Sequence, residues 1–352
     1  MTKKKKIVVF ISGIVFCLMC LGGILSYNLL KKPYFSIIIS SYNYGHYLPQ
    51  AIDSVLNSSY QNFELIVVND GSTDKTSEIL KQYKNHSKIT IIEHENQGLS
   101  LSRNKAMKIA KGKYFWFVDA DDWIDKNALK RLYDKTKKDD YDIVSFYTCG
   151  VNSNGLILGM GGYDMLPSKL ENNPDNIFTV QELSVWDMMS YPVTSGKQIY
   201  RREFTLKNNI DFPARTLFED DVFFLHHVFA GARISPLTHA LYYKRSHGQA
   251  ITSDRPKHFD SYIRICMYIW ERTHKYPMHE EKATGISNYY IEGILVRWRW
   301  LSTERKYKFY PDLLKWKEFL DRQPDNDYWN KSRSDFYEFF ASEEVAPYAP
   351  KE

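Results

Sequence analysis

Two aspartates two positions apart, Asp119 and Asp121, follow a run of large apolar residues in the stretch "YFWFVDADDW". In extended backbone the side chains of residues i and i+2 point the same way, so these carboxylates share one side of the chain. They repel each other unless a proton or a cation lies between them. Mg²⁺ and Mn²⁺ prefer oxygen ligands and often combine one or two carboxylates with substrate phosphates. The spacing therefore predicts a divalent-metal site, the alternative being a solvated loop in which Asp122 or Asp125 caps the next helix.

A second acidic group, Asp70, stands in "VVNDGSTD", again directly after an apolar run. Asp, Gly and Ser are common in turns and at helix N-caps, and we expect Asp74 to have that structural role. Asp70 can do the same, or it can accept hydrogen bonds from the N–H groups of a nucleobase.

These residues need a scaffold, and the pattern after residue 34 supplies one. Predicted strands cover residues 35–40, 64–69, 88–93, 113–118 and 141–147, and predicted helices cover residues 48–57, 77–83, 100–110 and 127–137. Such alternation is typical of an α/β fold with an open, mainly parallel sheet flanked by crossover helices. Ligands of these sheets bind outside the carboxyl ends of the strands. The clusters "SYN", "NDGSTD", "NQG" and "DADD" each follow a strand, so we expect them to converge on one crevice.

The alternation stops near residue 150. Residues 150–176 are rich in Gly, Asn and Pro and predict a loop or short irregular strands. Helices are expected at residues 180–190 and from about residue 218, and "ALYYKRSHGQAIT" is strand-like. From about residue 258 the pattern is helical.

The N-terminus predicts a membrane contact. Residues 7–30 carry no charge, and about 20 apolar residues span a bilayer. A cleaved signal peptide is the alternative, but no A-x-A-like site ends the segment. The lysines of residues 3–6 outnumber Lys31 and Lys32, which favours a cytoplasmic N-terminus for a single-pass anchor.

The composition narrows the class of protein. With 352 residues, 43% of them hydrophobic, the chain can build a sizeable core. Its net charge of +5 is spread without a concentrated basic stripe, so we expect no nucleic-acid partner. Four cysteines are too few for a disulfide scaffold and lack zinc-site spacing.

The ordered motifs resemble glycosyltransferase family 2, inverting enzymes of the GT-A fold. The resemblance is close over residues 35–132, through "NDGSTD", "NQGLSLSRNKAM" and "YFWFVDADDW", and looser to about residue 252, through "GKQIYRREF" and "FEDDVFF". It implies transfer of a sugar from a nucleotide-diphosphate donor to a hydroxyl, with Mn²⁺ or Mg²⁺ as cofactor. We expect a UDP-sugar donor and a hexosyltransferase type of activity.

The resemblance also implies roles for residues of the nucleotide half. Tyr42, after the strand that ends at Ser40, is similar to the residue that packs on the base, and both are expected to bind the nucleotide-sugar. Asp70 resembles the carboxylate that reads the base. Arg103, in "SRN", is similar to the basic residue near the nucleotide.

The acidic motifs carry over in the same way. Asp121 resembles the direct metal ligand, and Asp119 the residue near the ribose or the metal. In "FEDDVFF", Asp220 matches the general base that deprotonates the acceptor hydroxyl. The alternative is that Glu219, Asp220 and Asp221 only favour a helix N-terminus electrostatically. Asp221 also competes for the role of base.

Three further residues have open roles. Arg245 and His247 follow a predicted strand and can reach the diphosphate or the metal, or lie in a surface turn. Lys197 can contact the donor phosphates or the acceptor, or be a solvated lysine. Asn69 stands where the family often has Asp, and its amide can still form hydrogen bonds.

Processive relatives carry a Q-x-x-R-W signature and several membrane spans. Here "VRWRW" lacks the Gln, and one span is visible, so we expect a single transfer. The acceptor is expected to be a glycan or a lipid-linked sugar. The alternatives are a membrane-tethered sugar-binding protein and a Mg²⁺-dependent phosphotransferase, although the latter prefers its D-x-D on the first strand.

The expected organisation is a basic tail (residues 1–6), a transmembrane anchor (7–30), a GT-A domain (34–254) and a helical C-terminal extension (255–352). The GT-A domain divides into a nucleotide and metal half (34–148) and an acceptor half (149–254). With a single span, the charge bias at the N-terminus would place the catalytic domain on the far side of the membrane, which fits the lumen in a eukaryotic or viral cell. Long translocated domains follow the charge rule only loosely, and bacterial nucleotide-sugars are cytosolic, so in a bacterial surface-polysaccharide enzyme the catalytic domain is expected to face the cytoplasm.

Overall fold

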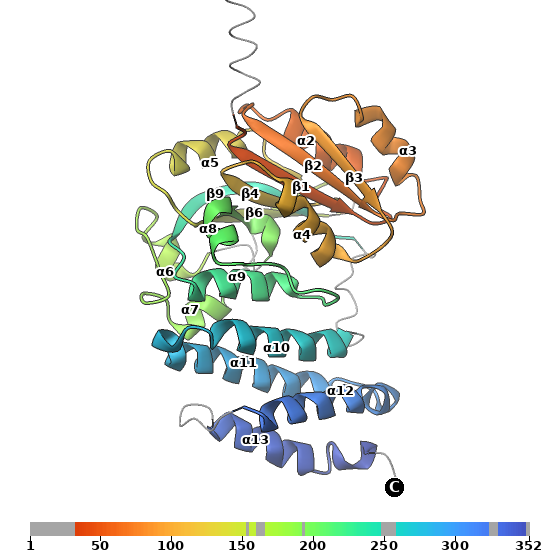
Figure 1. Ribbon diagram of the computed structural model, residues 1–352, viewed down its shortest axis with the longest axis vertical. Coiled ribbons are helices and arrows are strands. Elements are labelled where there is room, and N and C mark those ends of the chain that lie inside the picture. The colour runs from red at the N-terminus through yellow and green to blue at the C-terminus, as the bar shows by residue number, and fades with distance from the viewer. Residues whose placement is uncertain are drawn as a thin grey trace, which may run out of the picture.

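The computed structural model describes residues 32–152, 155–159, 166–191, 194–247, 258–323 and 330–349. The predicted membrane anchor, residues 7–30, lies outside these ranges. Over the described ranges, no helix combines the length and the apolar character needed to cross a bilayer. A sheet flanked by helices forms the upper part of the molecule, and further helices are stacked below it (Figure 1).

The first half of the sheet is parallel, as predicted. Its strands are β1 (Phe35–Ser41), β2 (Phe63–Asp70), β3 (Ile89–His94) and β4 (Tyr114–Asp119), in the spatial order β3-β2-β1-β4. The helices between them are α2 (Leu48–Leu56), α3 (Thr76–Leu80) with the 3-10 turn η1 (Lys81–Tyr83), and α4 (Leu99–Ile109). All seven predicted elements of this half are confirmed, with small shifts at their ends.

Both faces of this sheet are covered, which explains why its strands are apolar almost throughout. Alternate side chains of a strand point to opposite faces. Ile37 and Ile39 therefore pack in a core with α2 and α5 (Ala128–Thr136), whereas Ile38 packs in a second core with α4 and α9 (Glu219–Phe229). The carboxyl ends of the strands remain as the edge where polar residues gather.

The second half of the sheet is mixed, which corrects the prediction of a mainly parallel sheet. Its strands are β5 (Trp123–Ile124), β6 (Ile143–Val151), β7 (Ile157–Gly159), β8 (Gln198–Arg201) and β9 (Ile234–Arg245). The order continues β4-β8-β6-β9-β5; β8 is antiparallel to both β4 and β6, and only the β6–β9 pair is parallel. In the described part of the connection between β6 and β8 the helices, at Ser168–Glu171 and Val185–Met189, are only four and five residues long, shorter than the crossover helices that join parallel strands.

The connection after β6 also differs from prediction. It contains β7, the short helix α6 (Ser168–Glu171) and α7 (Val185–Met189), followed by the 3-10 turn η3 (Ser195–Lys197). The expected helix at residues 180–190 begins only at Val185. Ser184 and Asp187 form a capping box there, in which each side chain accepts the backbone N–H of the other residue. Sequence periodicity extended this helix too far towards the N-terminus because Val180 and Leu183 are buried without being helical.

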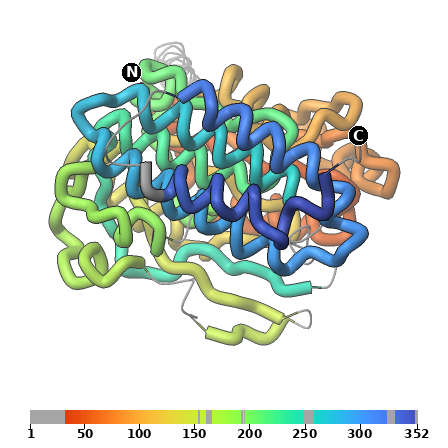
Figure 2. The backbone as a smooth tube through the Cα atoms, turned by 90° about the horizontal axis from the view of Figure 1, so that it is seen from below, coloured from red at the N-terminus to blue at the C-terminus, as the bar shows by residue number. Residues whose placement is uncertain are grey.

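The helical C-terminal region is confirmed. It comprises α10 (Phe259–Thr273), η5 (Pro277–His279), α11 (Glu280–Arg299), α12 (Thr303–Asp321), α13 (Asn330–Ala341) and η6 (Ala346–Tyr348), preceded in the chain by α8 (Arg202–Lys207) and α9. Helices α10, α11, α12 and α13 lie one below another under α9 (Figure 1), and the blue C-terminal segments face the viewer when the molecule is seen from below (Figure 2). Their apolar residues continue the core that α4 and α9 form on the sheet. The helical region is thus packed onto the layer that carries α9.

Candidate active site

The predicted polar residues meet at the carboxyl edge of the parallel strands. In the register of β1 and β4, Ser40 lies opposite Asp119, and in that of β1 and β2, Ser41 lies opposite Asn69. Asp70 ends β2 one residue later. Because parallel strands bring equivalent ends to one edge, the loops after β1, β2 and β4 surround a common space.

Arg103 connects this edge with α9. Its Nη2 lies 3.0 Å from Oδ1 of Asp119, and its Nη1 lies 2.9 Å from Oε1 of Glu219 and 2.9 Å from Oδ1 of Asp220. The guanidinium Cζ lies 5.1 Å from the ring centroid of Phe212 and 5.8 Å from that of Phe117. One buried cation thereby brings together acidic residues that are about one hundred positions apart in the sequence.

Burial and charge act against each other in this cluster. Burial opposes the charge on Arg103, but the neighbouring carboxylates outweigh it and raise the pKa of the guanidinium above its ordinary value. Burial also raises the pKa of Glu219 to about 8, and the negative charge of Asp220 adds to the shift. Arg103 therefore stays charged, while Glu219 has a tendency to hold its proton.

Asp121 faces His247, which comes from the segment after β9. Nε2 of His247 lies 2.8 Å from Oδ2 of Asp121. Burial raises the pKa of Asp121, and the nearby charge of Asp119 raises it further. The sequence left open whether His247 lies near the metal and diphosphate or in a surface turn, and in the structure it lies beside the D-x-D.

These side chains fit a divalent cation only in part. Within the ranges that the structure covers, no three His, Cys, Asp or Glu side chains form a complete metal-binding group. However, Mg²⁺-type sites often use one or two carboxylates and take their remaining ligands from substrate phosphates and water. The carboxylate of Asp121 with the imidazole of His247, 2.8 Å apart, suits such a partial set, whereas Asp119 contacts Arg103.

Arg245 is held beside the same site. Its Nε donates to the backbone carbonyl of Asp121 at 3.0 Å, and its Nη2 donates to Oε1 of Gln50 at 2.5 Å. The guanidinium lies between two rings, 4.7 Å from the centroid of Tyr47 and 4.8 Å from that of Trp123. Sequence reasoning missed Gln50 and Tyr47, because their contacts join segments almost two hundred residues apart.

Asp122 was also missed as a site residue. The sequence offered it as a helix cap, but its carboxylate accepts the hydroxyl of Tyr242 at 2.7 Å and the backbone N–H of Arg245 at 2.7 Å. Asp125 instead accepts the N–H of Asn127 at the start of α5. Asp122 therefore ties the end of β9 to the D-x-D loop, which places Arg245 next to it.

Asp70 is engaged by a neighbouring turn. Its two oxygens accept the backbone N–H groups of Gln97 and Gly98, each at 2.8 Å. The carboxylate thus orders the loop after β3 at the same edge, and its further lone pairs can still accept a donor. Asp74 has the structural role expected of it, accepting the N–H groups of Thr76 and Gly45.

Three other predicted residues are placed as follows. Tyr42 is 45% exposed at the rim of the edge, and the Ser40 hydroxyl is buried without a hydrogen bond to any described residue. Lys197 is only 3% exposed, so the solvated-lysine alternative is wrong. It lies in η3, next to the Gly196 carbonyl that accepts the indole N–H of Trp116.

Asp221 points away from Asp220. Its Oδ2 accepts the hydroxyl of Tyr290 on α11 at 2.8 Å, whereas Asp220 contacts Arg103. Consecutive residues of a helix differ by about 100° in direction, which explains how neighbours reach different layers. Of the two competing acids, Asp220 is the one that faces the D-x-D side.

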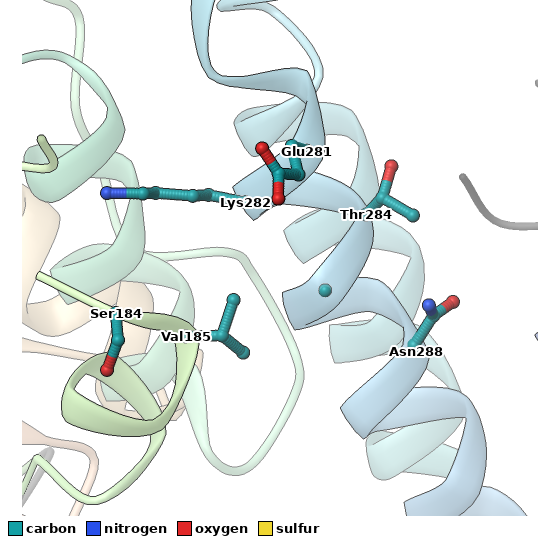
Figure 3. Close-up of a pocket in the computed structure, with 7 residues that line it drawn as sticks. Ser184, Val185, Glu281, Lys282, Thr284 and Asn288 are labelled. Carbon is teal, nitrogen blue, oxygen red and sulfur yellow. The ribbon is translucent and has the colours of Figure 1, made fainter. Parts of the chain in front are cut away.

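A separate cavity of about 450 Å³ lies between α7 and α11 (Figure 3). Lys282 extends from α11 towards the segment before α7 and donates to the carbonyls of Gln181 and Leu183, both at 2.8 Å. No residue that lines this cavity belongs to the predicted site. The cavity thus lies between α7 and the C-terminal helix α11, apart from the strand-end site.

Part of the chain is similar in sequence to known glycosyltransferases. Residues 36–178 match the model of Glycosyl transferase family 2. Glycosyltransferase GlyA of Streptococcus pneumoniae is 35% identical over 161 residues, which are 44% of this chain and 23% of that protein. The uncharacterized glycosyltransferase EpsJ of Bacillus subtilis is 30% identical over 233 residues, 62% of this chain and 63% of that one. The chain spans less than two thirds of the length of either relative.

The fold resembles a solved structure. Residues 1–349 of Staphylococcus aureus TarS, in complex with UDP-GlcNAc, superpose with a TM-score of 0.65 over 86% of this chain and 89% of that chain, at 21% identity. At this identity the likeness concerns the fold, and the mixed sheet with its flanking and C-terminal helices fits the GT-A class. The D-x-D and Arg103 lie within residues 36–178, the segment that matches the family 2 model.

Proposed function

We propose that the chain is an inverting glycosyltransferase, which moves one sugar from a nucleotide-diphosphate donor to a hydroxyl of a glycan or lipid-linked acceptor. The observation that carries the proposal is the contact of Arg103 with both Asp119 and Asp220. An inverting transfer needs the metal and diphosphate on one side of the sugar and a base on the other. Arg103 joins the two segments that would supply these parts.

The donor would bind along the strand-end edge. Tyr42 and Ser40 would contact the nucleotide, and Asp70 would accept an N–H of the base while it orders the turn at Gly98. The fixed guanidinium of Arg245 is suited to a diphosphate, because arginine binds phosphate oxygens with two parallel hydrogen bonds. The UDP-GlcNAc complex of the TarS structure supports a UDP-sugar as donor.

Asp121, Asp119 and His247 would hold Mn²⁺ or Mg²⁺. When bound, the cation would neutralise the charge that develops on the departing diphosphate. Arg103 keeps Asp119 in place from the other side, so the carboxylate is oriented before the donor arrives.

Asp220 would accept the proton of the acceptor hydroxyl as that oxygen attacks the anomeric carbon. Glu219, buried against Arg103, would support the guanidinium without reaching the acceptor. Lys197, buried in η3 beside Gly196, is assigned no contact with the donor or the acceptor.

The test is nucleotide release. The full chain is incubated with a panel of UDP-, GDP- and dTDP-sugars and Mn²⁺, alongside the Asp121→Ala and Asp220→Asn variants. We expect release with one donor, its loss in Asp121→Ala, and loss of transfer to an added acceptor in Asp220→Asn. Donor binding without turnover by the folded wild type would instead favour a sugar-binding protein.

We also propose that residues 7–30 anchor the chain in a membrane, with the catalytic domain on the cytoplasmic side where bacterial nucleotide-sugars are made. The support is the uncharged length of the segment. Carbonate extraction of membranes tests the anchor: the full chain should remain in the pellet, and a chain without residues 1–31 should not.

A further inference from the structure

The first turn of α9 is held from two opposite sides. Asp220 contacts Arg103 on the side of the sheet, and Asp221 accepts the hydroxyl of Tyr290 on the side of the C-terminal helices. Both contacts are 2.8–2.9 Å long and involve a largely buried partner. Arg103 on α4 and Tyr290 on α11 thus contact neighbouring residues of the same helical turn.

The loop before α9 needs such support. Arg215 and Phe218 have φ angles of 54° and 65°, in the left-handed region that side chains with a Cβ rarely adopt. Strained residues of this kind persist only when their surroundings fix them. The helix α10 supplies two contacts: the Thr216 hydroxyl donates to the Ser261 carbonyl at 3.0 Å, and the ring of Phe218 lies 6.3 Å from that of Tyr262.

Tyr290, a residue of α11, is itself packed against α10. Its ring lies 5.9 Å from that of Tyr262, and the guanidinium of Arg297 lies 3.7 Å from the centroid of Tyr262. A Cβ at Gly293 would lie 2.1 Å from the Tyr262 hydroxyl, so the close approach of the two helices requires glycine there. The pair of tyrosines is therefore a built part of the helix interface.

We propose that Tyr290 is a positioning residue for catalysis: through Asp221 it fixes the first turn of α9 and with it the base, Asp220. The inference rests on the proposed function. It makes the C-terminal helices part of the catalytic machinery, beyond any role in choosing the acceptor. Tyr290 itself touches no reacting atom.

The test compares Tyr290→Phe with Tyr289→Phe. The two variants lose the same hydroxyl group at adjacent positions, one buried against Asp221 and the other exposed. A displaced base slows the chemical step, so Tyr290→Phe should lower kcat about 10- to 100-fold. The donor KM and the affinity for the free nucleotide should stay within about twofold of wild type, since the strand-end edge is untouched. Tyr289→Phe should match wild type.

Two variants of Asp221 sharpen the result. Asp221→Asn keeps an oxygen that can accept the Tyr290 hydroxyl and should retain most of kcat. Asp221→Ala should behave like Tyr290→Phe, and the double variant should be no slower than the slower single one, because both remove the same bond. If the thermal midpoints of all variants lie well above the assay temperature, unfolding does not account for the loss of kcat.

Failure of the inference is distinct from failure of the proposed function. If wild type is active and Asp220→Asn is not, but Tyr290→Phe has the kcat of wild type, the positioning role is overturned. It is also overturned if kcat and donor affinity fall together, or if the two losses are additive. If wild type releases no nucleotide from any donor, the proposed function itself is wrong.

Discussion

The two regions that build the candidate site fix their side chains in different ways. In residues 35–119, polar groups stand where parallel strands end, and strand register alone places Ser40 opposite Asp119. In residues 202–247, the site groups come from a helix N-terminus and a strand end, and buried contacts with distant segments hold them. Backbone hydrogen bonds secure the first region, whereas single charged side chains secure the second. Substitutions of polar site residues should therefore lower the free energy of unfolding little in the first region. They should lower it much at the buried contacts that join the second region to the first.

The largest effect is expected at the tie itself. Arg103→Met would leave the carboxylates of Asp119 and Asp220 without their cation and the buried carboxyl of Glu219 without its partner, and removing one partner of a buried ion pair costs about 3–5 kcal/mol. Urea unfolding measures this loss. Arg264→Met is the matched control, because its pair with Asp260 is partly exposed and should contribute no more than about 0.5 kcal/mol. Similar losses in the two variants would contradict the contrast between the regions.

A smaller effect is expected where Asp122 holds β9. Asp122→Ala would leave two donors, the buried Tyr242 hydroxyl and the backbone N–H of Arg245, without their acceptor, at a cost of about 2–4 kcal/mol in unfolding free energy. Asp125→Ala, three residues along the chain, removes a partly exposed carboxylate and should cost about 1 kcal/mol or less. If Asp125→Ala lowered the free energy of unfolding more than Asp122→Ala, Asp122 would not be the residue that holds β9 to the D-x-D loop.

Acid should weaken the second region through α9. Burial lowers the pKa of His227 to about 3, whereas an unfolded histidine titrates near 6.5. The unfolded chain therefore binds a proton that the folded chain excludes, and stability is lost as the pH falls from about 6.5 towards 3. At pH 5 the loss is about 2 kcal/mol for this residue.

Urea unfolding at pH 7 and pH 5 measures the effect. In His227→Gln, the difference between the two pH values should shrink by about 2 kcal/mol. His86→Gln, at an exposed position of the first region, should leave the difference as in wild type. An unchanged difference in His227→Gln would show that another group accounts for the acid sensitivity.

The smallest effect is expected inside the first region. The Asn69 amide donates to Ser77 at 2.8 Å and to Oε1 of Glu93 at 3.0 Å, directly across from it on β3. Asn69→Asp would place two like charges opposite each other and cost about 1 kcal/mol or less. Glu93→Gln added to this variant should restore the stability. A loss well above that size, or no rescue, would mean that this region also depends on single side chains.

The sequence determined most of the first region, because its signals are local. Apolar runs, turn residues and the alternation of strands and helices predicted every element from Phe35 to Asp119, and with them the edge where Asp70 and Asp119 meet. Parallel strands joined by crossover helices can place their carboxyl ends in only one way. The D-x-D was also visible in the sequence as two carboxylates after an apolar run, whereas Asp220 was assigned as the base through the resemblance to glycosyltransferase family 2.

Only the tertiary structure decided how the second region meets the first. The sequence did not reveal the mixed direction of β8, the late start of α7, or the burial of Lys197. Nor did it separate Asp220 from Asp221, which differ in the layer that each one faces. These features depend on contacts between residues a hundred or more positions apart, and no local pattern records which distant charge a buried carboxylate will find.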